Sequence, residues 1–261
     1  MIKKIILVNL LLAVVLLPGM VWAANSAPSL TLGVAPSYSV GKYGETTDTK
    51  ITYVPVYAKY QVNDLSLKLI VPYISVESAG SVTSGGMVIG GPGKTVATTK
   101  IESGLGDIWL EGRYRFHGSR SAPDVVPYAK VKFGTASYSQ GLGTGENDYE
   151  LGLGVEWTVG SKIFPFVDGG YRLLGSPSGT SLNDIAVYDA GVMFALNDKN
   201  YLTGMFAGHQ SAQAGFAAAA DAIVAWNHRG ASGIALQVFY DKGLSDGSPD
   251  SAVGLGIEKR F

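Results

Sequence analysis

Residues 107–116 read Asp-Ile-Trp-Leu-Glu-Gly-Arg-Tyr-Arg-Phe, and apolar side chains alternate in them with charged ones. Successive side chains of a β-strand point to opposite faces. Ile108 and Leu110 therefore share one face, while Glu111 and Arg113 share the other. An apolar face opposite a charged face predicts a half-buried strand.

The same alternation recurs in the two segments that follow. In residues 125–133, Lys130 and Lys132 lie opposite an apolar face, and in residues 147–157 Glu150 belongs to the charged face. Extended along the chain, the pattern predicts about twelve strands, each near the ~10-residue alternating unit of a transmembrane strand. We place them near residues 29–40, 51–62, 65–76, 106–116, 125–136, 147–159, 163–174, 185–196, 201–210, 219–228, 233–243 and 251–261.

Short and long connections alternate between these segments, and the longest runs from about Glu77 to Ser103. An even number of strands with short turns at one end predicts an all-β, transmembrane antiparallel up-and-down β-barrel with both termini in the periplasm. A soluble β-sandwich also has short alternating strands, but it does not require aromatic residues at strand ends. The short turns are at Asn63-Asp64, Gly160–Lys162, Asn197–Asn200 and His228–Ala231, and the aromatics beside them are Tyr60, Tyr114, Phe116, Trp157, Tyr201, Trp226 and Phe261.

The two ends of the chain carry their own signals. Lys3 and Lys4 precede an apolar run from Ile5 to Leu17 and a small-residue cleavage site at Val21-Trp22-Ala23, the pattern of a secretory signal peptide. We therefore predict a signal peptide at residues 1–23 and an outer-membrane barrel domain at residues 24–261. The alternating last strand ends on Phe261, which we interpret as a signal read by the barrel-assembly machinery.

Composition excludes several other classes of protein. The chain has no cysteine, so it has neither a lipid-attachment site nor a disulfide framework. Its net charge of −1 argues against a nucleic-acid partner, because phosphate binding requires a basic surface. His117 and His228 have no partners at ligand spacing, so we expect no metal and no cofactor.

Four stretches resemble a known family. They are Ser103-Gly-Leu-Gly-Asp107, Gly143-Thr-Gly-Glu-Asn-Asp148, Pro165-Phe-Val-Asp-Gly-Gly-Tyr171 and Gly243-Leu-Ser-Asp-Gly-Ser-Pro-Asp250, with the ending at Phe261. Together they look like the outer-membrane proteins grouped as the putative MetA-pathway of phenol degradation family. The chain departs from the usual pattern at Lys259, where barrel C-termini carry an apolar residue. The resemblance implies a barrel that passes small organic solutes, often aromatic or apolar.

Strand parity places eight basic and nine acidic residues inside such a barrel. Basic and acidic residues are nearly balanced over the whole inner face, and a strongly selective pore would carry a ring of one sign, so we expect no strong charge selectivity. We also expect Lys132 roughly opposite Glu150 and Glu111 near Lys130. The predicted lumen-lining residues are Glu111, Arg113, Lys130, Lys132, Glu150 and Arg172.

Two alternatives to a solute channel are open. Small barrels are commonly filled by side chains, so the chain could be a filled barrel with a structural or surface-interaction role. His209 and Ser211 are spaced to share one face of a strand, with Asp221 on the next strand, as a lipid hydrolase would need. Parity points both toward the lumen, away from membrane lipid, so hydrolysis is the weaker alternative and no catalytic residue is assigned. Of the connections, the Glu77–Ser103 loop is the one expected to be able to close the mouth.

Overall fold

The computed structural model describes residues 6–8, 27–43, 47–78, 82–84, 87–89, 100–119 and 122–261. Over these residues the chain is all-β apart from a short 3-10 helix at Ala231–Gly233. No helix among them is long and apolar enough to cross a membrane. The strands of the large sheet are β2 (Ser29–Val34), β3 (Ser37–Gly41), β4 (Thr49–Val62), β5 (Leu65–Ser78), β8 (Lys100–Leu105), β9 (Ile108–Tyr114), β10 (Asp124–Phe133), β11 (Asp148–Glu156), β12 (Ile163–Leu173), β13 (Ile185–Ala195), β14 (Asn200–His209), β15 (Ala219–Arg229), β16 (Ile234–Gly243) and β17 (Ser251–Arg260).

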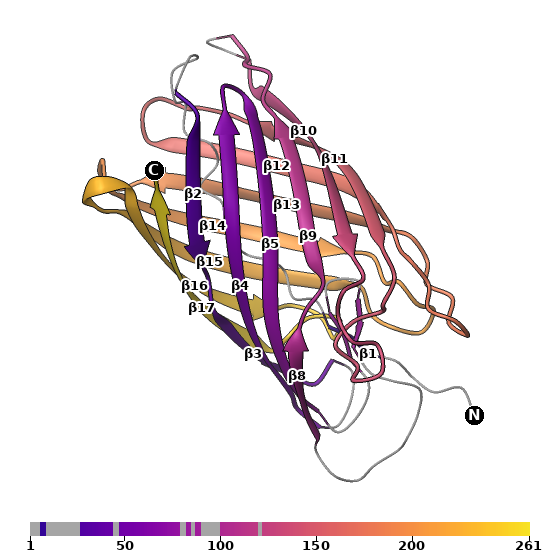
Figure 1. Cartoon of the computed structure of the whole chain (residues 1–261). Coiled ribbons are helices and arrows are strands. Elements are labelled where there is room, and N and C mark those ends of the chain that lie inside the picture. Colours follow the sequence, from indigo (N-terminus) through magenta and orange to yellow (C-terminus); the bar gives the residue numbers. More distant parts are fainter. Residues whose placement is uncertain are drawn as a thin grey trace.

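These strands close into a twelve-stranded antiparallel barrel (Figure 1). Successive strands of the large sheet are paired, except β2 with β3 and β8 with β9, and β17 pairs with β2 and β3 to close the sheet. Backbone hydrogen bonds between Leu30 and Phe261 extend this seam to the last residue. The predicted fold class is confirmed. Full closure leaves no exposed sheet edge at the seam, as a strand-built membrane domain requires.

Two barrel strands are interrupted, which corrects two predicted ranges. The segment predicted at 29–40 forms β2 and β3, which are separated by Ala35 and Pro36. Proline has no backbone N–H to donate to a ladder, and Ala35, next to Pro36, is level with the paired Pro55 and Pro72 of β4 and β5. The strand predicted from residue 106 begins earlier, at Lys100. Its first part, β8, pairs with residues 73–78 of β5, and its second part, β9, pairs with residues 65–70.

The predicted strands at 201–210 and 219–228 are regular, although alanine and glycine residues interrupt their apolar–polar alternation. β14 and β15 pair along their full lengths, and the alanine and glycine residues that blur their alternation are accommodated in the ladder. One turn lies two residues later than predicted, since β15 runs through His228 to Arg229 and the reversal falls at residues 230–233. This shift reflects Gly233, whose backbone has φ of +77°, a conformation that glycine adopts readily.

The outer face of the barrel is apolar and exposed. Leu151, Leu153, Val224 and Leu255 each expose about half or more of their surface, although all are aliphatic. Residues at the alternate positions of the same strands are largely buried. A continuous exposed apolar band of this kind suits contact with lipid chains.

Aromatic side chains on the outer face gather toward both ends of the strands. Tyr201 is the exception among the predicted aromatics, because it is buried on the inner face and donates to the carbonyl of Asp198. Aromatic girdles at both interfaces are typical of outer-membrane barrels. The exposed aromatics include Tyr60, Tyr114, Phe116, Trp157, Trp226 and Phe261 at one end, and Tyr38, Tyr73, Phe133, Tyr149, Tyr171, Tyr188 and Tyr240 toward the other.

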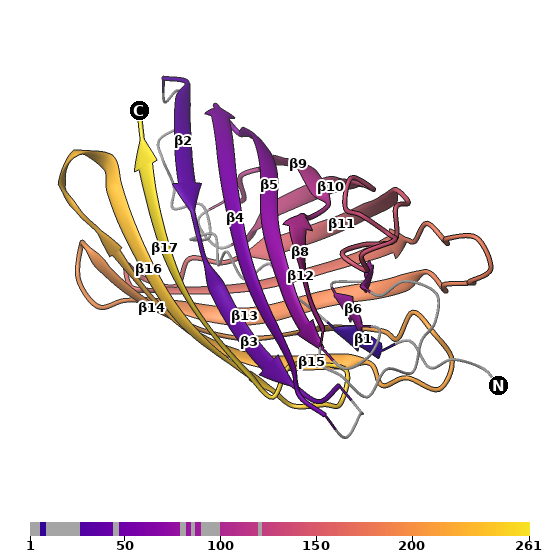
Figure 2. The ribbon, with the colours of Figure 1, turned by 60° about the horizontal axis from the view of Figure 1, so that its bottom comes forward.

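The two ends of the barrel differ in their connections. We call the end with the C-terminus and the short connections the turn end, and the opposite end, with the long connections, the loop end (Figures 1 and 2). At the loop end, β1 (Ile6–Val8) pairs in parallel with β6 (Val82–Ser84), which pairs with β7 (Met87–Ile89). The rest of the predicted signal peptide and most of the Glu77–Ser103 loop lie outside the described residues.

Candidate functional site

The inner face of β9 to β12 carries a network of ion pairs. Nζ of Lys130 lies 3.2 Å from Oε1 of Glu150 and 3.6 Å from Oε2 of Glu111. Nε of Arg172 lies 2.6 Å from the other oxygen of Glu150, and Nε of Arg113 lies 3.0 Å from Glu111. Five of the six predicted lumen residues are therefore brought together on one wall, and each is at least three-quarters buried.

The network continues toward the turn end. Arg113 reaches Asp168 on β12 at 3.0 Å, and Arg115 pairs with Asp124 and Glu156 at 2.8 Å each. These pairs join strands that are at most three positions apart in the barrel. They run along the wall of the lumen and do not bridge it.

The Tyr128 side chain contacts this network and occupies space that two glycines of the neighbouring strands leave free. Its ring is 4.7 Å from the Arg113 guanidinium and 4.8 Å from the Lys130 ammonium, distances at which a cation is attracted to the ring face. A Cβ atom at Gly152 or Gly170 would lie within 2.5 Å of the phenol group. The Tyr128 side chain can lie across β11 and β12 because Gly152 and Gly170 have no Cβ atom.

The register corrects one predicted pair. Lys130 lies opposite Glu111, as expected, but Glu150 also lies opposite Lys130, and Lys132 lies opposite Asp148. The shift of two residues arises because the connection between β10 and β11 is long and spans residues 134–147, so its two ends set the register.

Lys132, the sixth predicted residue, forms a separate buried cluster at the loop end. Its Nζ lies 2.8 Å from Asp148 and 3.4 Å from Asp107, and the three side chains are almost completely buried. Nζ also donates to Oγ1 of Thr144 at 3.1 Å. We call Asp107, Lys132 and Asp148 the buried triad.

The buried triad holds two long loops against the wall. Asp107 accepts a hydrogen bond from the Ala136 amide at 2.8 Å, and Asp148 accepts one from the Gly175 amide at 2.9 Å. These amides belong to the loops 134–147 and 174–184. A charge cluster with no solvent contact therefore fixes where both loops leave the barrel.

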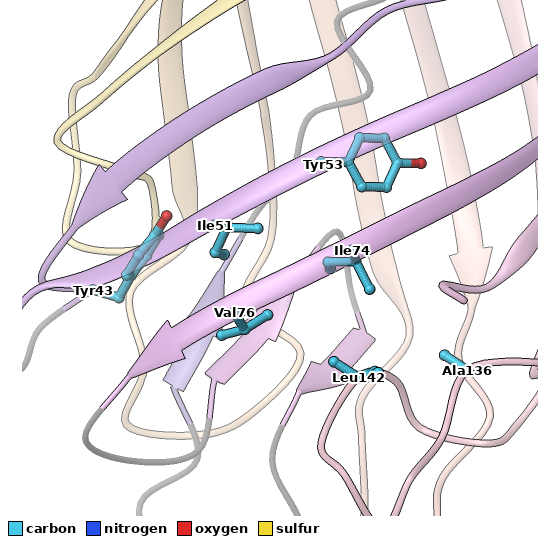
Figure 3. Close-up of a cluster of buried hydrophobic side chains, with 7 residues drawn as sticks. All are labelled: Tyr43, Ile51, Tyr53, Ile74, Val76, Ala136 and Leu142. Atoms are coloured by element: carbon cyan, nitrogen blue, oxygen red, sulfur yellow. The ribbon is translucent and has the colours of Figure 1, made fainter. Parts of the chain in front are cut away.

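Apolar side chains of these loops fold inward over the lumen. Leu142 is buried against Ile51, Ile74 and Val76 on the inner face of β4 and β5 (Figure 3). A Cβ atom at Gly104 would lie 3.0 Å from the Leu142 side chain, so a glycine at this position leaves room for Leu142.

A second apolar cluster joins the first through Phe216. It contains Leu174, Leu182 and Ala212, and Phe216 packs against both clusters. We call Leu142, Leu174, Leu182, Ala212 and Phe216, from the loops 134–147, 174–184 and 210–218, the plug. Side chains of three other loops therefore pack together at the loop end, while most of the Glu77–Ser103 loop lies outside the described residues.

The plug was missed at the sequence level. Leu142 stands between two glycines, and Phe216 follows Gly215. An isolated large apolar residue inside a Gly-rich, otherwise polar loop is the one signal that could have pointed to it. Periodicity cannot detect such a residue, because it belongs to no strand.

The predicted hydrolase residues do not form a catalytic arrangement. His209 is buried on the inner face, its Nδ1 contacts the carbonyl of Gln210, and its Nε2 has no hydrogen-bond partner among the described residues. The Ser211 hydroxyl donates to the carbonyl of Gln213 at 2.7 Å. Among the described residues, the Asp221 carboxylate makes no hydrogen bond to His209 or Ser211. A nucleophile, a base and an orienting acid in hydrogen-bond contact are therefore not assembled here.

The described histidines likewise join no metal-binding group. His117 Nε2 lies 2.8 Å from Asp64, and Nδ1 lies 3.4 Å from Asp124 at the turn end. His228 Nδ1 lies 2.9 Å from the side-chain oxygen of Asn200. Within the described ranges, no group of three or more His, Cys, Asp or Glu residues could hold a metal ion.

A closed twelve-stranded barrel with an apolar exterior, aromatic girdles and a charged interior has the architecture of an outer-membrane β-barrel. Neither a family model nor a curated protein matches the chain. Among solved structures, an outer-membrane channel from Pseudomonas putida F1 is similar, with a TM-score of 0.72 and 15% identity over 94% of this chain and 99% of that one. The NanC porin has a TM-score of 0.58 and 13% identity over 88% of this chain and all of its own. The KdgM porin follows at 0.56 and 8%, covering 88% of this chain and 99% of its own. At these identities the likeness is one of fold.

Proposed function

We propose that this protein is a channel of the outer membrane for small organic solutes, as its resemblance to the MetA-pathway family implies. The observation that supports this most is the course of the ion pairs, which follow the wall from β9 to β12. Side chains paired along a wall leave the axis of the barrel to water and solute. In a barrel whose lumen is filled with side chains for rigidity, ion pairs would be expected to join opposite walls.

One observation favours the second candidate, a filled barrel with a structural or surface-interaction role. The plug covers the loop end with buried apolar side chains, and a closed mouth admits no solute. In the channel proposal, the plug is the closed state of a mouth that opens. The two proposals therefore differ in a measurable flux.

The proposed location and partners follow from the same fold. The signal peptide would take the chain to the periplasm, the barrel-assembly machinery would insert it through the signal at Phe261, and outer-membrane lipid would surround the apolar band. The proposed cargo is a small organic solute and not a nucleic acid.

Liposome swelling tests the channel proposal. Proteoliposomes containing the folded wild-type barrel should swell in arabinose and in phenylalanine, two small polar solutes that cross lipid slowly. Swelling should be slow, because the plug must open, but faster than in protein-free liposomes. No swelling in either solute, for the wild type and for a variant with a weakened plug alike, would refute the channel and leave the filled barrel.

The C-terminal residue offers a prediction about assembly. Phe261→Ala keeps the backbone hydrogen bonds to Leu30 but removes the exposed ring. If the ring is the assembly signal, this variant should give less heat-modifiable barrel in the outer membrane of cells, yet should refold normally in detergent. Tyr240→Ala, which also removes an exposed outer-face aromatic, is the matched control. Wild-type insertion of Phe261→Ala would contradict the assembly role.

A further inference from the structure

Charged residues form a continuous row across eight neighbouring strands of the inner wall. Each member lies directly opposite the next one in the strand pairing, and only one position of the row is uncharged. The row starts near the turn end on β17 and reaches the loop end on β12. Its members in order are Arg260, Thr31, Lys59, Lys68, Glu111, Lys130, Glu150 and Arg172.

The two halves of this row differ in how their charges are compensated. On β9 to β12, Glu111 and Glu150 form ion pairs with the basic residues on either side. Lys59 and Lys68 instead lie directly opposite one another on β4 and β5. Within the described part of the chain, neither lysine has a carboxylate at ion-pair distance.

The acids nearest to these two lysines, Glu258 and Glu111, attract them from beyond ion-pair distance. Glu258 accepts a hydrogen bond from the Tyr57 hydroxyl at 2.8 Å, and Glu111 is shared between Arg113 and Lys130. Arg229 and Arg260 are the other charged neighbours of Lys59. The near balance of charge over the whole wall thus hides a local basic excess.

Two like charges directly opposite on one face of a sheet destabilise it, and burial makes the repulsion stronger. Lys68 is 3% exposed, and its closest described partner is the Tyr57 ring, 4.5 Å away. A cation over an aromatic face gains some attraction, but the ring carries no net charge. A bound anion between the two ammonium groups would remove the repulsion.

A buried apolar cluster lies beside the lysine pair. Tyr57 and Ile70, two residues along from Lys59 and Lys68 on the same inner face, cluster with Ala35 and Trp109. The indole N–H of Trp109 is buried and has no acceptor among the described residues. A buried donor without an acceptor is unfavourable, so this donor points to an oxygen-bearing ligand.

We propose that Lys59 and Lys68 bind the carboxylate of a small organic acid whose apolar or aromatic body rests on Tyr57, Ile70 and Trp109. The site lies toward the turn end of β4 and β5, whereas the buried triad lies toward the loop end of the neighbouring strands β9 to β11. Its role in solute passage rests on the proposed channel function, whereas binding itself does not.

Calorimetric titration of the folded, detergent-solubilised full chain with benzoate tests the site without requiring flux. We expect wild type to bind benzoate, and Lys59→Gln/Lys68→Gln to bind it at least about tenfold more weakly, because charge-assisted hydrogen bonds are lost. Lys50→Gln is the matched control, since Lys50 is on the same strand, faces outward and pairs with Glu77. Benzyl alcohol, which has the ring but no carboxylate, should bind wild type at least about tenfold more weakly than benzoate does.

Several results would overturn the site. They are equal benzoate affinity in wild type and the double variant, equal affinity for benzoate and benzyl alcohol, and binding of inorganic phosphate as tight as that of benzoate. Because removal of the repulsion should stabilise the ligand-free barrel, the double variant should also unfold at a higher temperature than wild type, and a lower one would contradict the proposal. Benzoate binding without any solute flux would refute the channel but keep the site. Solute flux without benzoate binding would refute the site but keep the channel.

Discussion

The variant Leu142→Ser/Phe216→Ser is expected to admit arabinose at least about tenfold faster than wild type in the swelling assay. Both side chains are packed in the plug, and Phe216 links its two halves. Truncating a large buried apolar side chain removes about 2–5 kcal/mol of packing. Since about 1.4 kcal/mol changes a population tenfold, even a partial loss should shift the loops strongly toward an open arrangement.

Leu244→Ser is the matched control for this variant. Leu244 also lies in a connection at the loop end, between β16 and β17, but its side chain is 55% exposed. Its removal should leave flux at the wild-type rate. Both variants should keep the heat-modifiable migration of a folded barrel, because the strands are untouched. A folded double variant with wild-type flux would show that the plug does not control entry.

Lys132→Met should lower the free energy of unfolding by about 3–5 kcal/mol, the range typical when one partner of a buried ion pair is removed. Asp107 and Asp148 would be left facing each other with no counter-charge and no solvent. Guanidinium titration of the barrel refolded in lipid vesicles measures the loss. Because the same two carboxylates hold the loops 134–147 and 174–184, solute flux should rise as well.

Two further variants separate charge from side-chain volume at this position. Lys162→Met makes the same substitution in an exposed turn and should change stability little. Asp107→Asn/Lys132→Met/Asp148→Asn removes all three charges and should recover much of the lost stability, because neutral side chains are far less costly to bury than unpaired charges. If the triple variant were as unstable as Lys132→Met, packing and not charge would explain the effect.

The candidate site could be predicted only where strand parity governs it. Parity put Glu111, Lys130 and Glu150 on one face, and the structure joins them in one network. The carboxylates that pair with Lys132 could not be predicted, because the register depends on the length of the loop 134–147, and that loop has no hydrophobic periodicity. The apolar residues of that loop were invisible to the same reasoning, because Leu142 acquires its role only through contact with β4 and β5.

The sequence by itself determined the barrel: its strand count, the face of each strand that meets lipid and the end that carries the short turns. It could do so because a transmembrane strand must alternate apolar with polar side chains to satisfy lipid on one side and the lumen on the other. Only the tertiary structure decided that side chains of three loops pack together at the loop end, that Lys132 lies between Asp107 and Asp148, and that Lys59 lies opposite Lys68 with no acid at ion-pair distance in the described part of the chain. Those features arise from register and loop packing between distant segments, and no local pattern in the chain encodes them.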